Sequence, residues 1–394
     1  MKTTRITTGT MTRRSVLRGG AAIAGSMMLG APALANTKPV KLGVLMPFSG
    51  GLELFGEQAM QGIEMLVDET NSSGGVLGRQ IEIIKADNRT DPKTSVERVQ
   101  ELIRRDQVDA VIGPVTSSAR DAMKSSIERG RKPLLYAIDY EGGVCSDYIA
   151  CYSPLPAHYV DPLIPYLMET VGKKVYLFGA DYVWPQKMNE AISKSVAATG
   201  GTVVGEEYTP FGVKDFSTTI RKIEESGAEA VVLSLPGADG VTFIKQFTAA
   251  GMKNKTRLAF LGFNENYLPG LSAPESEGII GCSAFIQTLD RPESKDFVAR
   301  QKARYGDDVV VSNYVDSHYG ITKFFLEAMK RADTDETDKI MQALPGNLTI
   351  ANGEVTMRAD DKHVDLNMLI FEARDQKLQM QKYVGKIIAP NQCA

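Results

Sequence analysis

The chain has 394 residues, of which 43% are hydrophobic and 24% are charged, and its formal net charge is −3 at pH 7. A chain of this length exceeds what a single hydrophobic core usually supports, so the sequence predicts two domains. The acidic balance argues against nucleic acid as a partner.

The first 35 residues have the pattern of an export signal. Arg13 and Arg14 precede a Gly- and Ala-rich apolar run, and Ala33-Leu34-Ala35 offers a small-x-small cleavage site. Glycine, serine and proline interrupt this run, whereas a membrane anchor needs about 20 uninterrupted apolar residues. We therefore expect a leader resembling a twin-arginine signal, cleavage near Ala35 and a periplasmic product. Removing the leader takes away five basic residues and no acid, which moves the net charge from −3 to −8.

The four cysteines suit an oxidising compartment. Cys145 and Cys151 lie six residues apart in an expected loop, and we predict that they form a disulfide. Cys282 and Cys393 offer a second pairing, which the sequence leaves open. The three histidines are scattered singly and no C-x-x-C motif is present, so we expect no metal and no cofactor.

Short apolar strands alternate with amphipathic helices along most of the mature chain. Strands are expected at residues 40–48, 81–86, 109–113, 133–138, 174–179, 201–206, 228–235 and 257–262. Helices are expected at residues 58–71, 93–105, 118–128, 187–199, 216–226 and 241–251. This alternation predicts two α/β lobes, each with a mostly parallel sheet flanked by helices.

The pattern changes after about residue 285. Helices are expected at 291–305, 312–331 and 335–344, and antiparallel strands at 353–357, 364–373 and 378–384. We assign residues 36–155 and 287–338 to an N-terminal lobe, and residues 156–286 and 339–394 to a C-terminal lobe.

Catalytic signatures are missing from the sequence. It contains no G-x-S-x-G elbow, no H-E-x-x-H and no Walker loop, so we expect a binding protein rather than an enzyme. Two other classes stay open at this point. One is a ligand-sensing regulator on the same fold, which the leader argues against. The other is an exported oxidoreductase, for which the sequence offers no cofactor motif.

The candidate site residues follow predicted strands, where open α/β sheets bind their ligands. Ser117 and Ser118 begin a helix after the third strand, so their hydroxyls and the free N–H groups of the helix start can bind a ligand oxygen. The equally weighted alternative is that Thr116 or Ser117 only caps the helix.

An aromatic pair follows another strand. Pro185 favours an extended backbone at Trp184, and residues two apart in an extended segment face the same way. Tyr182 and Trp184 are therefore predicted to form one aromatic wall against the ligand, with a pair of core aromatics as the alternative. Trp184 is the single tryptophan of the chain.

Two acidic residues that follow later strands are further candidates. Asp239 follows the strand at 228–235 and can accept hydrogen bonds from a ligand N–H group or cap the next helix. Glu265, in the loop after the strand at 257–262, is a weaker candidate of the same kind.

Several motifs resemble one family. Asn71-Ser-Ser-Gly-Gly-Val-Leu-Gly-Arg79, Tyr140-Glu-Gly142 and Gly179-Ala-Asp-Tyr-Val-Trp-Pro185 are similar to motifs of the type I periplasmic solute-binding proteins of ABC transporters. The amide- and urea-binding branch resembles the chain most, and the branched-chain amino-acid-binding proteins are more distant. The likeness covers nearly all of the mature chain.

The resemblance implies a fold, a role and a set of ligand contacts. The fold has two lobes joined by three hinge crossovers that close over a ligand. The protein would be a monomer or weak dimer that delivers a small polar, nitrogen-containing solute to a membrane permease. Ser117 would hydrogen-bond the ligand, Tyr182 and Trp184 would stack on it, and Asp239 would receive its nitrogen.

The chain departs from the family pattern at one position. Short-amide binders carry a threonine after the fourth strand, where this chain has Ile138 followed by Asp139. The loss of a hydroxyl and the gain of an acid favour a larger ligand, or one with an ammonium group. Ile138 and Asp139 are therefore also expected to contact the ligand.

Overall fold

The computed structural model describes residues 38–394, and the predicted leader at residues 1–35 lies outside the described residues. The described chain begins with a parallel five-stranded sheet in the order β2-β1-β3-β4-β5. Its strands are β1 (Val40–Met46), β2 (Ile81–Asp87), β3 (Ala110–Ile112), β4 (Leu134–Tyr136) and β5 (Ile149–Cys151).

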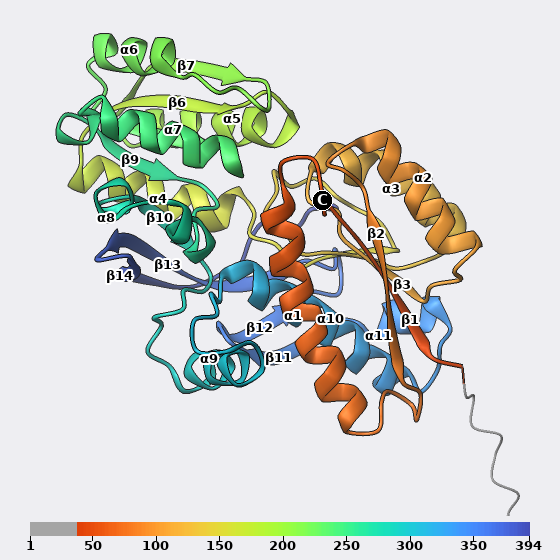
Figure 1. Cartoon of the computed structure of the whole chain (residues 1–394). Helices are drawn as coiled ribbons and strands as arrows, with labels where there is room; N and C mark the ends of the chain where they lie inside the picture. Colours follow the sequence, from red (N-terminus) through yellow and green to blue (C-terminus); the bar gives the residue numbers. More distant parts are fainter. Residues whose placement is uncertain (1–37) are drawn as a thin grey trace, which may run out of the picture. The chain divides into compact units, whose positions relative to one another are not determined.

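Helices pack in pairs around this first sheet. Helix α1 packs against α10, and α2 packs against α3 (Figure 1). Helix α10 comes from far along the chain, so distant segments complete this part of the structure. The helices are α1 (Glu53–Ser72), α2 (Pro92–Arg104), α3 (Ser117–Gly130), α9 (Pro292–Tyr305), α10 (Asn313–Ala332) and α11 (Thr337–Ala343).

A second sheet has the order β11-β12-β13-β10-β9-β8-β6-β7, and β14 also pairs with β13. Strands from β6 to β10 pair in parallel, whereas β11 to β14 pair antiparallel. The strands are β6 (Lys174–Ala180), β7 (Thr202–Thr209), β8 (Ala230–Ser234), β9 (Arg257–Phe260), β10 (Ile280–Ser283), β11 (Gly346–Ile350), β12 (Gly353–Met357), β13 (Val364–Arg374) and β14 (Lys377–Ile387). The structure therefore confirms the predicted fold of two α/β lobes.

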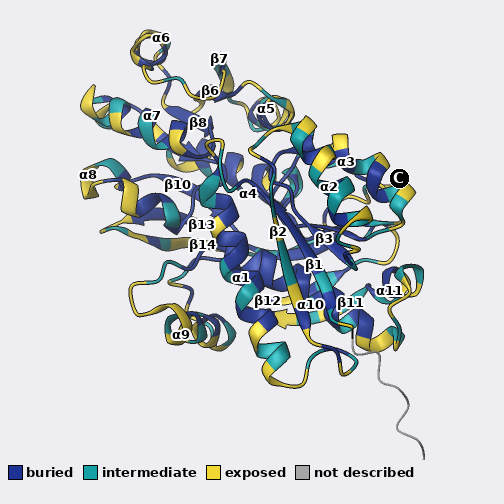
Figure 2. Ribbon diagram, turned by 45° about the vertical axis from the view of Figure 1, so that its right-hand side comes forward, coloured by how far each residue is buried: buried dark blue, intermediate teal, exposed yellow. Residues whose placement is uncertain are grey.

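The helices of this second part are α4 (Pro156–Thr170), α5 (Val183–Ala198), α6 (Ser217–Ser226), α7 (Ala238–Ala249) and α8 (Ala273–Ser276), with short 3-10 turns η1 (Met252–Asn254) and η2 (Glu265–Gly270). Central strands are buried on both faces, as Figure 2 shows, and every residue of β8 is buried. Parallel strands that are covered on both faces have continuous apolar sequences. The strands could therefore be predicted from the sequence.

The sequence did not predict helix α4. Prolines inside a helix remove a backbone hydrogen bond, and Pro162 and Pro165 both lie within this one. Burial of its apolar face nevertheless favours the helix, because Leu163, Ile164 and Leu167 are fully buried.

No described helix is sufficiently long and apolar to span a bilayer.

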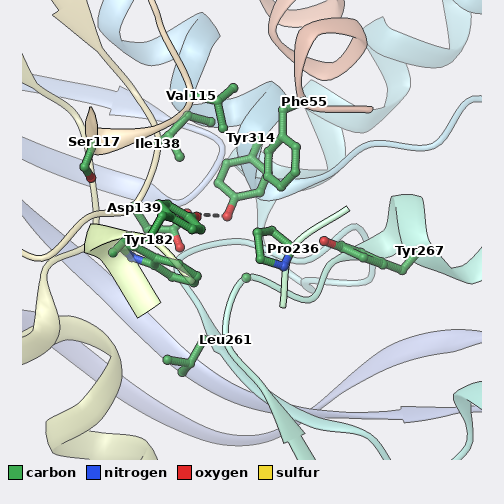
Figure 3. Close-up of a pocket in the computed structure, with 12 residues that line it drawn as sticks. Phe55, Val115, Ser117, Ile138, Asp139, Tyr182, Pro236, Leu261, Tyr267 and Tyr314 are labelled. Carbon is green, nitrogen blue, oxygen red and sulfur yellow. Dashed lines mark hydrogen bonds between the residues drawn. The ribbon is translucent and has the colours of Figure 1, made fainter. Parts of the chain in front are cut away.

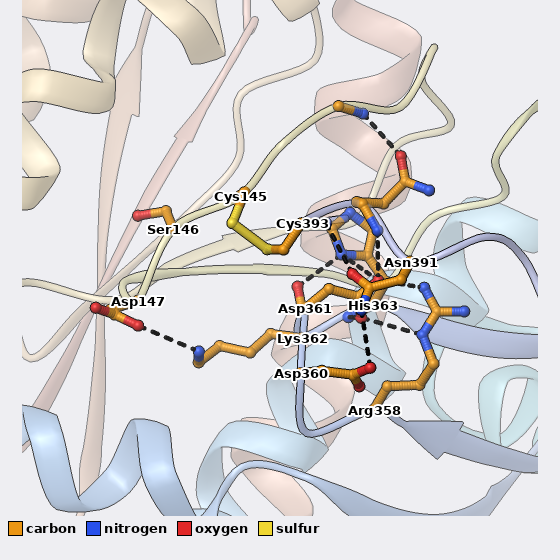
Figure 4. The surroundings of a disulfide bond; sticks show 12 residues. Cys145, Ser146, Asp147, Arg358, Asp360, Asp361, Lys362, His363, Asn391 and Cys393 are labelled. Carbon is orange, nitrogen blue, oxygen red and sulfur yellow. Dashed lines mark hydrogen bonds and ion pairs between the residues drawn. A yellow bond between two sulfur atoms is a disulfide. The ribbon is translucent and has the colours of Figure 1, made fainter.

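The predicted disulfide between Cys145 and Cys151 is wrong. Cys145 instead bonds to Cys393 near the C-terminus, 248 residues away (Figure 4). Cys151 is free and buried within β5, where it pairs with Tyr136 of β4. Cys282 is also buried and free, inside β10, which excludes its pairing with Cys393.

Replacing Cys393 by serine is expected to lower the free energy of unfolding by about 2–4 kcal/mol, because the bond restrains the unfolded chain across a long segment. Urea unfolding measures the change. Cys145→Ser should give the same loss, and the double variant should lose no more than either single one. A reducing agent should destabilise the wild type and leave Cys393→Ser unchanged. Additive losses in the double variant would contradict the pairing.

Candidate ligand-binding site

A small pocket lies where segments that follow strands of both sheets meet. The carboxyl ends of parallel strands are where open α/β sheets place ligands. Its lining is mainly aromatic and aliphatic, with few polar groups (Figure 3). The lining residues are Phe55, Val115, Ser117, Ile138, Asp139, Tyr182, Trp184, Pro236, Leu261, Gly262, Tyr267 and Tyr314.

The segment after β3 places Ser117 in the pocket. Thr116 is the cap of α3, because its Oγ1 accepts a hydrogen bond from the Ala119 N–H at 3.3 Å. Ser117 is the next residue, and its Oγ–H donates to Glu141 Oε2 at 2.7 Å. Ser118 is not among the lining residues, and its hydroxyl donates to Thr116 Oγ1 at 3.4 Å. Capping and pocket lining are thus divided between neighbouring residues.

Asp139, after β4, brings an acid to the pocket. The hydroxyl of Tyr314 donates a hydrogen bond to its Oδ1, as Figure 3 shows. Asp139 is only 4% exposed, and this burial raises its pKa to about 6. Among the twelve lining residues, all within the described chain, it is the one with a formal charge at neutral pH. Ile138 contributes an apolar side chain beside it.

Tyr182 and Trp184 form the aromatic wall, although the extended backbone predicted at Trp184 is wrong. Tyr182 is the extended N-cap residue of α5, and Trp184 lies in the first turn of that helix. Their rings are stacked, with centroids 6.4 Å apart and planes at 29°. The buried Nε1–H of Trp184 has no hydrogen-bond partner in the described chain, which leaves a donor for a ligand.

Tyr267 supplies a second donor from η2. Its hydroxyl oxygen accepts from the Gly237 N–H at 3.0 Å. A phenolic hydroxyl has one hydrogen of its own, so Tyr267 can still donate that hydrogen into the pocket. The donors of Trp184 and Tyr267 thus come from segments around the second sheet, whereas Ser117 and Asp139 come from segments around the first.

Asp239 and Glu265 do not line this pocket. Asp239 Oδ2 accepts from the Gly212 N–H at 2.7 Å and so holds the loop after β7. Glu265 Oε1 accepts from the Gln287 N–H at 2.6 Å, and Glu265 faces a separate hollow. Burial raises the pKa of Glu265 to about 8. The described residues contain no group of three or more His, Cys, Asp or Glu side chains placed to hold a metal ion.

The sequence did not single out several lining residues. Phe55 and Tyr314 belong to α1 and α10, and their ring centroids are 5.2 Å apart. Apolar residues on a helix follow the same sequence pattern whether they face the core or a pocket. No local signal therefore distinguishes Phe55 and Tyr314 from core residues. Leu261 and Gly262 follow β9 and line the pocket. Their position directly after a predicted strand could have identified them from the sequence.

Comparisons with known proteins agree with this architecture. Residues 39–377 match the family described as "Periplasmic binding protein". The Leu/Ile/Val-binding protein homolog 8 of Brucella abortus is 26% identical over 370 residues, which cover 86% of this chain and 89% of the relative.

Solved structures share the fold at low identity. The isoleucine complex of the branched-chain amino acid transporter substrate binding protein LivJ of Streptococcus pneumoniae has a TM-score of 0.80 at 22% identity, covering 89% of this chain and 100% of that one. A benzoate complex of an ABC transporter solute binding protein of R. palustris has a TM-score of 0.82 at 20% identity, covering 89% and 98%. This is a family of binding proteins, not of enzymes. With a two-lobed α/β fold, a pocket at the strand ends and a family match over most of its length, the chain belongs to the periplasmic binding proteins.

Proposed function

We propose that this protein is the exported substrate-binding component of an ABC importer and that it captures a small, nitrogen-containing solute in the pocket described above. The observation that carries the proposal is the division of polar groups in the pocket. Ser117 and Asp139 offer hydrogen-bond acceptors, whereas Trp184 and Tyr267 offer donors.

An amide group or an amino acid matches this division. Its N–H groups would meet Asp139 and Ser117, and its carbonyl or carboxylate oxygen would meet Trp184 and Tyr267. Its apolar or planar part would lie against the aromatic side chains. Relatives are named for leucine, isoleucine and valine, and one relative of the same fold was solved with isoleucine. The amide and urea branch is the finer assignment that the Tyr140-Glu-Gly142 motif favours.

Ligand capture would follow from closure of the two lobes. We assign residues 36–155 and 287–338 to one lobe and residues 156–286 and 339–394 to the other, with three hinge crossovers. A ligand that contacts both lobes binds the closed form better than the open form and so shifts the population toward it. The leader at residues 1–35, cleaved near Ala35, would export the protein to meet its membrane permease. We expect a monomer or weak dimer.

Ligand binding is expected to change the intrinsic fluorescence of the protein, because Trp184 is its single tryptophan and lines the pocket. A thermal-shift screen over amides, urea, and branched, neutral and aromatic amino acids identifies ligands, and the emission spectrum is then recorded at saturation. Ligands that raise the melting temperature should also shift the Trp184 emission. A confirmed ligand that leaves the spectrum unchanged would place binding elsewhere, and a screen without any ligand from these classes would contradict the function.

A further inference from the structure

We infer that Glu141 sets the ligand class of this pocket by holding Ser117 as a hydrogen-bond acceptor, so that the site selects ligands with N–H groups over nitrogen-free acids. This inference rests on the proposed solute-binding function. It adds a specificity-determining residue that is itself not among the residues lining the pocket.

The direction of the Ser117–Glu141 hydrogen bond follows from their chemistry. The two oxygens are 2.7 Å apart, and Ser117 is 1% exposed. A carboxylate can only accept, so the single hydroxyl hydrogen of Ser117 is committed to Glu141. What Ser117 can offer a ligand is a lone pair.

Arg120 holds Glu141 in this role. Its Nη2 donates to the other carboxylate oxygen, Oε1, at 3.0 Å. The guanidinium is 2% exposed and lies over the rings of Tyr136 and Tyr140, 5.0 and 4.5 Å from their centroids. A guanidinium carries donors only, so whatever atom faces Arg120 has to be an acceptor.

The chain after Glu141 is also tied down. The Gly143 N–H donates to Gln392 Oε1 at 2.7 Å, and two residues later Cys145 is bonded to Cys393 (Figure 4). These two links attach the loop to the C-terminal tail. Glu141 is therefore restrained both through its side chain and through the backbone that follows it.

The consequence is a head-group site of one polarity. Tyr314 donates to Oδ1 of Asp139, and because a carboxylate has about four lone-pair sites, the acid still offers acceptors to a ligand. Ser117 and Asp139 both line the pocket. A carboxylate placed there would meet lone pairs and a negative charge, whereas an amide or ammonium group would meet two acceptors.

Matched ligands test the inference on the wild-type protein. Titrations followed by Trp184 fluorescence and calorimetry compare benzamide with benzoate, and L-isoleucine with 3-methylpentanoate. Each pair differs in the presence of N–H groups. The nitrogen-bearing member of a pair that binds should bind at least tenfold more tightly at pH 7.5. Equal or tighter binding of the nitrogen-free acid overturns the role of Glu141 and leaves solute binding intact, whereas failure of every amide and amino acid in the wider screen removes the proposed function.

The variant Glu141→Gln tests the mechanism, because it changes polarity without changing shape. Arg120 requires an acceptor, so the amide oxygen of the new side chain turns to Arg120 and its NH₂ turns to Ser117. The hydroxyl hydrogen of Ser117 is then free to point at the ligand. The ratio of benzamide to benzoate affinity, or of L-isoleucine to 3-methylpentanoate affinity, should fall at least tenfold, with a gain for the acid.

Ser117→Ala is the matched control. It removes the acceptor and creates no donor, so the nitrogen ligand should lose affinity and the acid should gain none. Melting of the ligand-free variants verifies that both are folded. An unchanged affinity ratio in folded Glu141→Gln overturns the inference, and if that variant does not fold, equal or tighter wild-type binding of the nitrogen-free acids still overturns it.

Discussion

Replacing Asp139 by asparagine is expected to weaken the binding of an ammonium- or amide-bearing ligand by about 30- to 150-fold at pH 7.5. Burial raises the pKa of Asp139 to about 6, so the group is ionised at that pH. A hydrogen bond to a charged acceptor contributes about 2–3 kcal/mol, which corresponds to the stated loss. Asparagine keeps the size of the side chain and an oxygen for Tyr314, so the change is confined to charge and to one acceptor.

Calorimetric titration of both proteins with the same ligand measures the effect. Asp147→Asn serves as the control, because the Asp147 side chain is 94% exposed and lies outside the pocket. In the wild type, affinity should also fall as the pH drops below about 6, because Asp139 becomes protonated, and in Asp139→Asn this decline should disappear. Equal affinities in the two proteins at pH 7.5 would show that Asp139 does not receive the ligand nitrogen.

The second large effect is on stability. The free energy of unfolding of the ligand-free protein should rise by about 2 kcal/mol between pH 8.5 and pH 6.5. Burial raises the pKa of Glu265 to about 8 and that of Asp316 to about 7, above their ordinary values of 4.5 and 3.8. The folded protein therefore binds protons that the unfolded chain releases in this range, and stability increases as the pH falls.

Buried histidines act in the opposite direction at lower pH. Burial lowers the pKa of His158 and of His318 to about 4, below the ordinary value of 6.5. Below about pH 6.5 these histidines bind protons in the unfolded chain but stay neutral in the folded protein. Their contribution to stability therefore falls as the pH drops toward 4. The uptake of protons by the unfolded histidines therefore offsets much of the gain from the buried acids, so the rise in stability levels off below about pH 6.

Urea unfolding at pH 8.5, 6.5 and 4.5 measures this profile. Glu265→Gln is the matched variant, because glutamine keeps the acceptor for the Gln287 N–H and removes the titrating group. The rise between pH 8.5 and 6.5 should be smaller in that variant than in the wild type. A wild-type protein that is more stable at pH 8.5 than at pH 6.5 would contradict the assignment of these buried acids.

Much of the fold could be predicted from the sequence, because strands and helices are indicated by patterns within short segments. The apolar runs that became β1, β6 and β8 alternate with helix-period segments, and that alternation by itself indicates parallel sheets. The same rule places the ends of parallel strands at one edge, so Ser117, Tyr182 and Trp184 could be predicted to line a pocket.

Contacts between distant residues needed the tertiary structure. Cys145 pairs with Cys393 across 248 residues, although Cys151 is six residues away. Which cysteine pairs with Cys145 depends on which side chain the sheet buries. The spacing of cysteines in the sequence does not give this information. Asp139 and Asp239 were both expected at the site, yet Asp239 holds Gly212, and only Asp139 lines the pocket.

The sequence by itself therefore determined the class of fold and the strand ends at which a ligand can bind, because periodicity and strand order act over short segments. Only the tertiary structure decided which groups face one another there. Tyr314 reaches Asp139 across 175 residues, and Glu141 reaches Ser117 across 24. Such contacts depend on how helices and loops pack in three dimensions, and the polarity of the site depends on these contacts.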